Sequence, residues 1–366
     1  MRDFFCKHKK LHLWLLADLG LLAAYWLCRG NRAWMNALAA HVTAPLRRAI
    51  GRICYRVDFS VAEALCVLLV VLAATYVVWS VIAVIRRRGH GALQRAYGAV
   101  LGAVCAALTI YVGFCFLLGI DSYADGFQEK SGLYAQPVAL EDLQAVTAYF
   151  ARQVAQTAPG VARDEDGVFA EDRRAILENS VRAYDALEKE YPFLAFDDTG
   201  VKPVYFSRFL SALDFTGIYC PFTGESNVNV DSPASMLPAT AAHELAHQRG
   251  ITSEQECNFL AILASTTCGD EVYAYSGWLS GYIYLGNALY RVDPEAYWAI
   301  RSALPETVQA DLRYQNEYWD QFEDKAAQKV SNRVYDSFLK GYGQELGLQS
   351  YGTVVDLLVT YYKDWI

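Results

Sequence analysis

The residues best suited to chemistry in this chain are two histidines, His243 and His247, which enclose Glu244 in the sequence His-Glu-Leu-Ala-His. They are the only histidines in residues 121–366. A spacing of four places both imidazoles on one face of a helix, where they can bind a single zinc ion. A carboxylate beside such an ion can accept a proton from metal-bound water. We therefore predict His243 and His247 as zinc ligands and Glu244 as the general base.

A catalytic zinc ion needs a third protein ligand, and the soluble part of the sequence offers no third histidine. Gly250 can end the first helix and let the chain reverse, so that Glu254 and Glu256 are the first carboxylates on the next helix. These two side chains point to nearly opposite faces. Glu254 shares its face with Asn258, whose side chain could orient a ligand histidine. We predict Glu254 as the third ligand and Asn258 as this partner, with Glu256 as the alternative ligand.

Charge divides the chain into two unlike parts. Residues 1–120 hold 14 Lys and Arg against 4 Asp and Glu, a net charge of +10, whereas residues 121–366 hold 18 against 36, a net charge of −18. A basic, apolar first part joined to an acidic remainder predicts a membrane anchor that carries a soluble domain. The acidic domain would repel phosphates, so we expect no nucleic-acid partner.

Three apolar segments of the anchor are candidates for helices that cross the lipid bilayer. Residues 64–85 and 97–120 contain no charged side chain, and the shorter segment at about 11–28 contains one carboxylate, Asp18. This first segment could instead be a signal peptide. The large residues before Cys28 do not form a cleavage site of small residues, so we predict a retained helix.

Basic residues predict how the anchor is oriented. Four Lys or Arg residues precede the first segment, and Arg86–Arg88 end the second. With three spans, both clusters lie on one side, which we take as cytoplasmic. Six arginines in residues 29–60 would then face outward, which counts against this orientation, although that loop could lie along the surface as an interfacial helix. We predict a multi-pass protein of the cell membrane with its soluble domain on the extracytoplasmic side.

The soluble domain, residues 121–366, is expected to be mainly helical. Helical periodicity is clear at about 139–156 and 170–190. Prolines and glycines interrupt residues 202–233, where short strands are indicated instead. Leu237–Pro238 then opens the helix that carries the two histidines, with proline in its first turn. The predicted fold class is α+β, mainly helical, with three transmembrane helices followed by this domain.

The segment Gly224–Val230 alternates polar and apolar residues just before the histidine helix. We predict an edge strand to which a substrate peptide adds, with Asn227 and Asn229 facing one side and hydrogen-bonding the peptide. An ordinary edge strand with its polar residues toward water explains the pattern equally well. Hydrolysis also needs a donor to the oxyanion, from a backbone N–H, an arginine or a tyrosine. Candidate tyrosines are Tyr275, Tyr282 and Tyr351.

Two motifs carry a resemblance to known proteins: His243-Glu244-x-x-His247 and Glu254-Gln255-Glu256-Cys257-Asn258. Together they resemble the gluzincin metallopeptidases, above all integral-membrane peptidases of the CAAX-protease and heat-shock HtpX type, although Cys257 and Asn258 replace the Ala and Asp of the second motif there. Three spans, the segment Pro221–Asn229 and a Tyr-Asp-Ser-Phe-Leu-Lys stretch near the C-terminus resemble more closely the bacterial membrane proteins of domain-of-unknown-function family 3810. The resemblance implies a zincin-like soluble domain.

We therefore predict a membrane-anchored zinc-dependent peptidase whose substrate is a peptide or protein. Zinc would polarise the scissile carbonyl, and Glu244 would pass the proton to the leaving amine. The alternative function is a membrane sensor or peptide-binding protein whose zincin domain does not turn over substrate. A helical domain with a coincidental motif and no metal is a further alternative.

Overall fold

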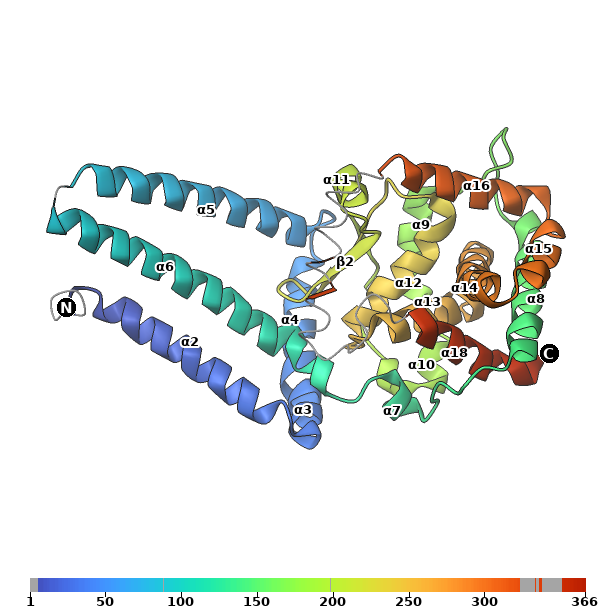
Figure 1. The fold of residues 1–366 in the computed structure, drawn as a ribbon, viewed down its shortest axis with the longest axis horizontal. Coiled ribbons are helices and arrows are strands. Elements are labelled where there is room, and N and C mark those ends of the chain that lie inside the picture. The colour runs from blue at the N-terminus through green and yellow to red at the C-terminus, as the bar shows by residue number, and fades with distance from the viewer. Residues whose placement is uncertain (1–5, 88, 198, 323–332, 334–335, 338–350) are drawn as a thin grey trace.

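Figure 1 shows three long helices at one end of the molecule and a mainly helical domain at the other. This computed structural model describes the chain apart from residues 1–5, 88, 198, 323–332, 334–335 and 338–350. The domain contains many helices and one small sheet, and the three long helices precede it. The predicted fold class, a mainly helical α+β chain with three transmembrane helices before a soluble domain, is confirmed.

The long helices are α2 (Lys9–Cys28), α5 (Val61–Ile85) and α6 (His90–Phe114), and a π-helical turn (Cys115–Gly119) continues the last one. All three are long and apolar enough to cross a membrane, which makes the protein membrane-embedded. In α2, Asp18 is buried and accepts a hydrogen bond of 2.8 Å from the hydroxyl of Thr109 in α6. The carboxylate in the first span is thus satisfied inside the helix bundle.

An interfacial segment, residues 32–54, crosses the ends of these helices (Figure 1). It comprises α3 (Arg32–Leu38), a π-helical turn (Ala39–Thr43) and α4 (Ala44–Cys54). Its apolar side chains Val42, Leu46 and Ile53 are 44–63% exposed, whereas Arg47 is only 2% exposed. A segment that exposes apolar side chains and buries an arginine against the domain suits the surface of a bilayer, where the apolar side chains meet lipid.

The charged face of the interfacial segment pairs with the acidic domain. The ion pairs join Arg32 to Asp125 and Glu129, Arg47 to Asp121, and Arg48 and Arg52 to Asp197. Four of the six arginines in the loop therefore have carboxylate partners on the same side of the spans.

The helices of the domain pack around one apolar core between α8, α12, α13 and α14. The domain helices in chain order are α7 (Phe127–Ser131), α8 (Leu140–Thr157), α9 (Arg173–Asn179), α10 (Leu187–Glu190), α11 (Ser207–Ala212), α12 (Leu237–Gln248), α13 (Glu254–Thr267), α14 (Glu271–Val292), α15 (Pro294–Ser302), α16 (Glu306–Asp320) and α18 (Tyr351–Tyr362). The expected helix at 139–156 is α8. The helical segment expected at 170–190 is present but divided into α9 and α10, because the chain bends after α9. There the Ser180 hydroxyl donates to the Leu177 carbonyl and accepts from the Val201 N–H.

The sheet has three short strands: β1 (Lys202–Pro203), β2 (Gly217–Cys220) and β3 (Glu225–Val228). Their order is β1-β3-β2, with β1 parallel and β2 antiparallel to β3. The prediction that residues 224–230 form an edge strand is therefore wrong, because β3 is the central strand. Its parallel partner β1 lies more than twenty residues upstream, and no local pattern in the sequence reveals that pairing.

The sheet is also joined to the membrane helices. The Glu225 carboxylate accepts from the backbone N–H groups of Val61 (3.2 Å) and Ala62 (2.7 Å), which start α5. It also forms a buried ion pair of 2.6 Å with Lys202 of β1. On the turn between β2 and β3, Phe222 packs so closely on Gly113 of α6 that a Cβ there would lie 2.9 Å from the ring. The sheet is thus fixed to the ends of two spans.

The buried pair of Arg47 and Asp121 (2.6 Å) gives a direct test of how much the anchor stabilises the domain. Arg47→Met keeps a long apolar stem but leaves Asp121 buried without its partner, which should cost about 3–5 kcal/mol of unfolding free energy. Thermal unfolding of the full chain in detergent measures this cost. Arg52→Met in the same helix is the control, because Arg52 is well exposed and its pair with Asp197 should matter little. Equal changes in Tm for both variants would contradict the assignment.

Candidate metal centre

Two helices and the turn between them position the candidate ligands. Pro238 occupies the first turn of α12, and the helix ends before Gly250, whose φ of 87° lets the chain reverse. The side chain of Ser253 then caps α13 by accepting from the N–H of Glu256. A Cβ at Gly250 would lie 2.8 Å from a terminal guanidinium nitrogen of Arg47, so the turn also requires glycine for space.

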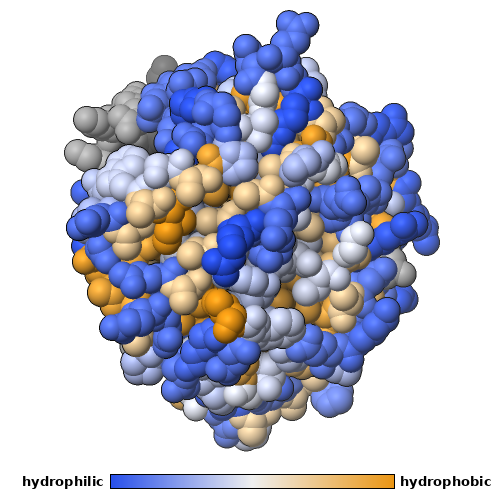
Figure 2. Space-filling view, turned by 90° about the vertical axis from the view of Figure 1, so that its right-hand side faces the viewer, coloured by the Kyte–Doolittle hydropathy of each residue, from blue (hydrophilic) through white to orange (hydrophobic). Residues whose placement is uncertain are grey.

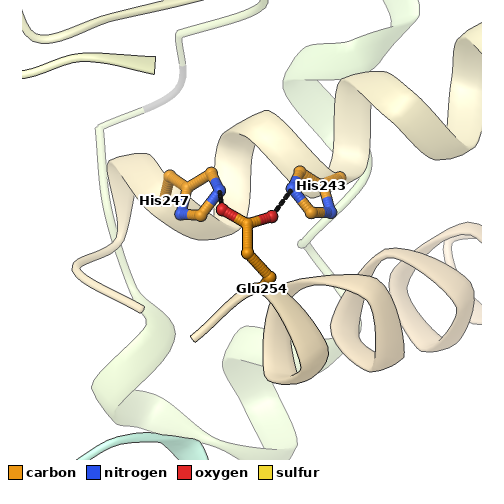
Figure 3. Close-up of side chains that lie close together, drawn as sticks. All are labelled: His243, His247 and Glu254. Atoms are coloured by element: carbon orange, nitrogen blue, oxygen red, sulfur yellow. Dashed lines mark ion pairs between the residues drawn. The ribbon is translucent and has the colours of Figure 1, made fainter. Parts of the chain in front are cut away.

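The turn brings Glu254 between the two histidines (Figure 3). Its carboxylate oxygens lie 3.2 Å from Nε2 of His243 and 3.5 Å from Nε2 of His247. The three candidate ligand atoms all lie within 4.8 Å of one another. The structure thus brings together the three residues that the sequence analysis selected, and zinc binding itself stays a prediction.

Glu256, the alternative third ligand, points elsewhere. Its carboxylate accepts hydrogen bonds from the backbone N–H groups of Phe127 (2.8 Å) and Gln128 (3.1 Å) at the start of α7. A residue that secures α7 in this way contributes to the fold around the site. Of the two glutamates, only Glu254 faces the imidazoles.

Hydrogen bonds on the far side of each imidazole fix its orientation. Nδ1 of His243 lies 2.8 Å from the side-chain oxygen of Asn258, and Nδ1 of His247 lies 2.9 Å from the carbonyl oxygen of Ile251. Because both neighbours accept hydrogen bonds, each Nδ1 carries a proton, and Nε2 of each ring is left toward Glu254 as the nitrogen that could bind a metal ion. Asn258 takes the position predicted for it. The Ile251 carbonyl escaped the sequence analysis, because a backbone group leaves no signal in side-chain identity.

The electrostatics of the site favour a cation among these groups. Burial alone would raise the pKa of Glu254, but the two histidines hold it well below its usual range. Burial alone would lower the pKa of His247, but Cys257 and Glu254 raise it well above its usual value. The charge and the hydrogen bonds of the two histidines thus stabilise the Glu254 carboxylate as an anion. Two imidazole nitrogens and one carboxylate are also the ligand set of a known class of catalytic zinc site.

Glu244 lies beside the ligands but is not one of the three converging groups. Its side chain is buried, and one carboxylate oxygen has no hydrogen-bond partner among the described residues. Burial raises the pKa of Glu244 to about 7. The carboxylate rests on Gly217 of β2, where a Cβ would lie 2.5 Å from its oxygen. Gly217 is one of the glycines that interrupt residues 202–233, and nothing in the local sequence indicates its fit to Glu244, because the two residues are far apart along the chain.

The structure does not place Asn227 and Asn229 at an open edge. Both side chains are buried. The Asn227 amide donates to the carbonyl of Ile218 (3.3 Å), and the Asn229 amide donates to the carbonyl of Phe215 (2.9 Å). These amides stabilise the hairpin and the loop before it. The structure therefore gives no support to the expectation that they face a bound peptide: Asn227 lies on the central strand and Asn229 just after it, and neither side chain is exposed.

The tyrosine candidates for an oxyanion donor gain no support. The Tyr275 hydroxyl donates to the buried carboxylate of Asp311, and its ring stacks on Phe169. Tyr282 is buried on α14 beside Tyr297. The side chain of Tyr351 lies outside the described residues.

The ligand assignment predicts opposite results for two conservative substitutions. Glu254→Gln replaces a charged ligand by a weakly coordinating amide, so the zinc content of the purified protein should fall strongly. Glu256→Gln keeps an acceptor oxygen for α7 and leaves the imidazoles untouched, so zinc content should stay close to that of the wild type. Elemental analysis of both variants decides between them. The reverse pattern would move the third ligand to Glu256.

Comparison with known proteins places the chain in a family without an assigned activity. No curated protein and no solved structure matches it. The model of a family described as "Protein of unknown function (DUF3810)" matches residues 40–359. The matched range begins in the interfacial segment and includes α5, α6 and every residue of the candidate centre. The chain therefore belongs to the DUF3810 family.

Proposed function

We propose that this protein is a membrane-anchored zinc-dependent peptidase of the gluzincin type that hydrolyses a peptide or protein substrate. The observation that carries the proposal is the combination of three converging ligand atoms with a separate buried carboxylate beside them. His243, His247 and Glu254 would hold the zinc ion, which when bound supplies a Lewis acid and lowers the pKa of water. Glu244 remains available for proton transfer.

The proposed work of Glu244 follows from its surroundings. One oxygen of its carboxylate has no hydrogen-bond donor among the described residues, so it can accept a proton from the attacking water. Its burial raises the pKa of Glu244 to about 7, so the carboxylate takes up that proton readily and can still give it to the more basic leaving amine. A sensor that only binds metal needs no such carboxylate beside its ligands. For this reason we place the peptidase ahead of a non-catalytic sensor or peptide-binding protein.

The strand that would bind substrate is β2 in place of β3. β2 lies at one side of the sheet, with no strand beyond it among the residues that the structure describes. Gly217, at the start of β2, contacts Glu244. A peptide that adds to the outer edge of β2 in extended form would therefore run past the proposed general base.

Removing the general base should separate metal binding from catalysis. Glu244→Gln should keep zinc bound but lower peptide cleavage by about 10²–10⁴-fold, because only proton transfer is lost. His243→Ala should lose both zinc and cleavage. Zinc content and turnover of a peptide library, measured on the same preparations, test this. A wild-type protein that binds one zinc ion and cleaves nothing in a broad library would favour the sensor.

A second variant reaches the same carboxylate without changing it. Gly217→Ala would force the Glu244 side chain to move, and displacement by about 1 Å can lower turnover about 100-fold. Zinc content should be unchanged. Gly30→Ala is the matched control, because a Cβ at Gly30 meets nothing within 4 Å. Full activity of Gly217→Ala would remove Glu244 from the proposed role.

We propose that the soluble domain lies on the extracytoplasmic side of the cell membrane. The start of α2 and the end of α5 lie at the end of the spans away from the domain (Figure 1). The two basic clusters of the sequence adjoin these helix ends, and such clusters favour the cytoplasm. Protease added to intact spheroplasts should digest the domain. Protection that ends only on lysis would reverse the orientation.

A further inference from the structure

Four exposed aromatic side chains gather where α5 meets the soluble domain. Phe59 is 61% exposed, Tyr205 86%, Phe206 52% and Phe209 63%. We call these four residues the aromatic cluster. Large exposed apolar patches on folded domains mark surfaces that contact a partner or a membrane.

Hydrogen bonds attach the cluster to the start of α5. The carboxylate of Glu63, in the first turn of α5, accepts from the backbone N–H groups of Tyr205 (2.9 Å) and Phe206 (2.8 Å). From the other side, the ammonium group of Lys202 donates to the carbonyl of Phe59 (2.9 Å). Figure 1 shows α11, which carries Phe209, next to this end of α5. The position of the aromatic cluster along the bilayer normal is therefore set by the position of the first turn of α5.

The length of α5 indicates where in the bilayer that first turn lies. Its 25 residues span about 37 Å at 1.5 Å per residue, whereas the hydrocarbon core of a bilayer is about 30 Å thick. The first turn, with Glu63, then lies in the polar headgroup layer. Aromatic residues are enriched at this depth in membrane proteins. Tyr205 suits it in particular, because its ring is apolar and its hydroxyl is polar.

The interfacial segment gives independent evidence that this side of the domain faces the membrane. It exposes Val42, Leu46 and Ile53 while its arginines turn toward the domain, and the loop from α4 leads directly to Phe59 and α5. The opposite end of the molecule differs. Figure 2 shows that the face farthest from the spans is mostly hydrophilic, with apolar side chains set between polar ones. The exposed apolar side chains of the interfacial segment and of the aromatic cluster thus belong to elements at the end of the domain that adjoins the spans.

We propose that the aromatic cluster is a lipid-binding surface that inserts into the interfacial layer of the leaflet from which α5 emerges. Its four side chains would dock the domain on the bilayer in addition to the three spans. Because α11 and β1 belong to the same part of the domain as β2, docking would hold the sheet beside the headgroups. The proposal concerns lipid contact alone and holds whether or not the protein is a peptidase.

Photocrosslinking in the full chain tests the proposal. A benzophenone amino acid is placed at position 209, and separately at position 206, and the protein is reconstituted in nanodiscs of phosphatidylcholine and phosphatidylglycerol. Position 70 in α5 is the positive control, since Val70 is 68% exposed on a span. Position 298 in α15, at the far end of the domain, is the negative control, since Trp298 is 56% exposed.

After irradiation, mass spectrometry should find phospholipid adducts at 206 or 209 in an amount comparable with position 70 and at least tenfold above position 298. Adducts no more frequent than at position 298 would overturn the proposal. So would a crosslink to a second copy of the chain in place of lipid, which would make the cluster a dimer interface. Unchanged Tm of the labelled proteins shows that each variant is folded.

Discussion

The buried ion pair of Arg47 and Asp121 is the constraint on which the arrangement of this protein depends. Arg47 comes from the interfacial segment, and Asp121 directly follows α6. Both approach the turn at Gly250, which returns the chain from α12 to α13. Taking two charges out of water is costly, so such a pair adds little net stability to the fold. Its main effect is on which arrangement of the surrounding segments forms. Here it specifies that the membrane segments and the turn of the candidate metal centre can meet in only one way.

The uneven distribution of charge between residues 1–120 and 121–366 helps to hold these two parts of the chain together. The basic loop and the acidic domain lie on the same side of the spans, and the arginines of α4 form ion pairs with carboxylates of the domain. Residues 44–60 are therefore packed as part of the soluble domain, although they precede two of the spans. Lys202 in the sheet is a further example, since its ammonium group donates to the carboxylate of Glu225 and to the carbonyls of Cys54 and Phe59, which lie before α5. A domain separated at residue 120 would leave these groups buried without partners.

Much of the candidate centre was predictable because its geometry is local. A spacing of four fixes two imidazoles on one helix face, and a glycine followed by a cap places the next carboxylate opposite them. The helix phase shared by Glu254 and Asn258 then distinguished Glu254 from Glu256. The errors concern contacts between distant segments. The central position of β3 depends on β1, and the space for Glu244 depends on Gly217, neither of which is visible from the spacing of the motif.

The hairpin of β2 and β3 connects the proposed general base to the membrane. At one end of β2, Gly217 contacts the carboxylate of Glu244, and beyond the other end Phe222 packs on Gly113 of α6. A strand of four residues is only about 13 Å long and cannot flex much between two such contacts. Neither contact can shift freely on its own, because both positions tolerate only glycine at close approach. Two elements thus determine the position of Glu244. One is α12, which carries it, and the other is α6, which holds the hairpin against which its carboxylate packs.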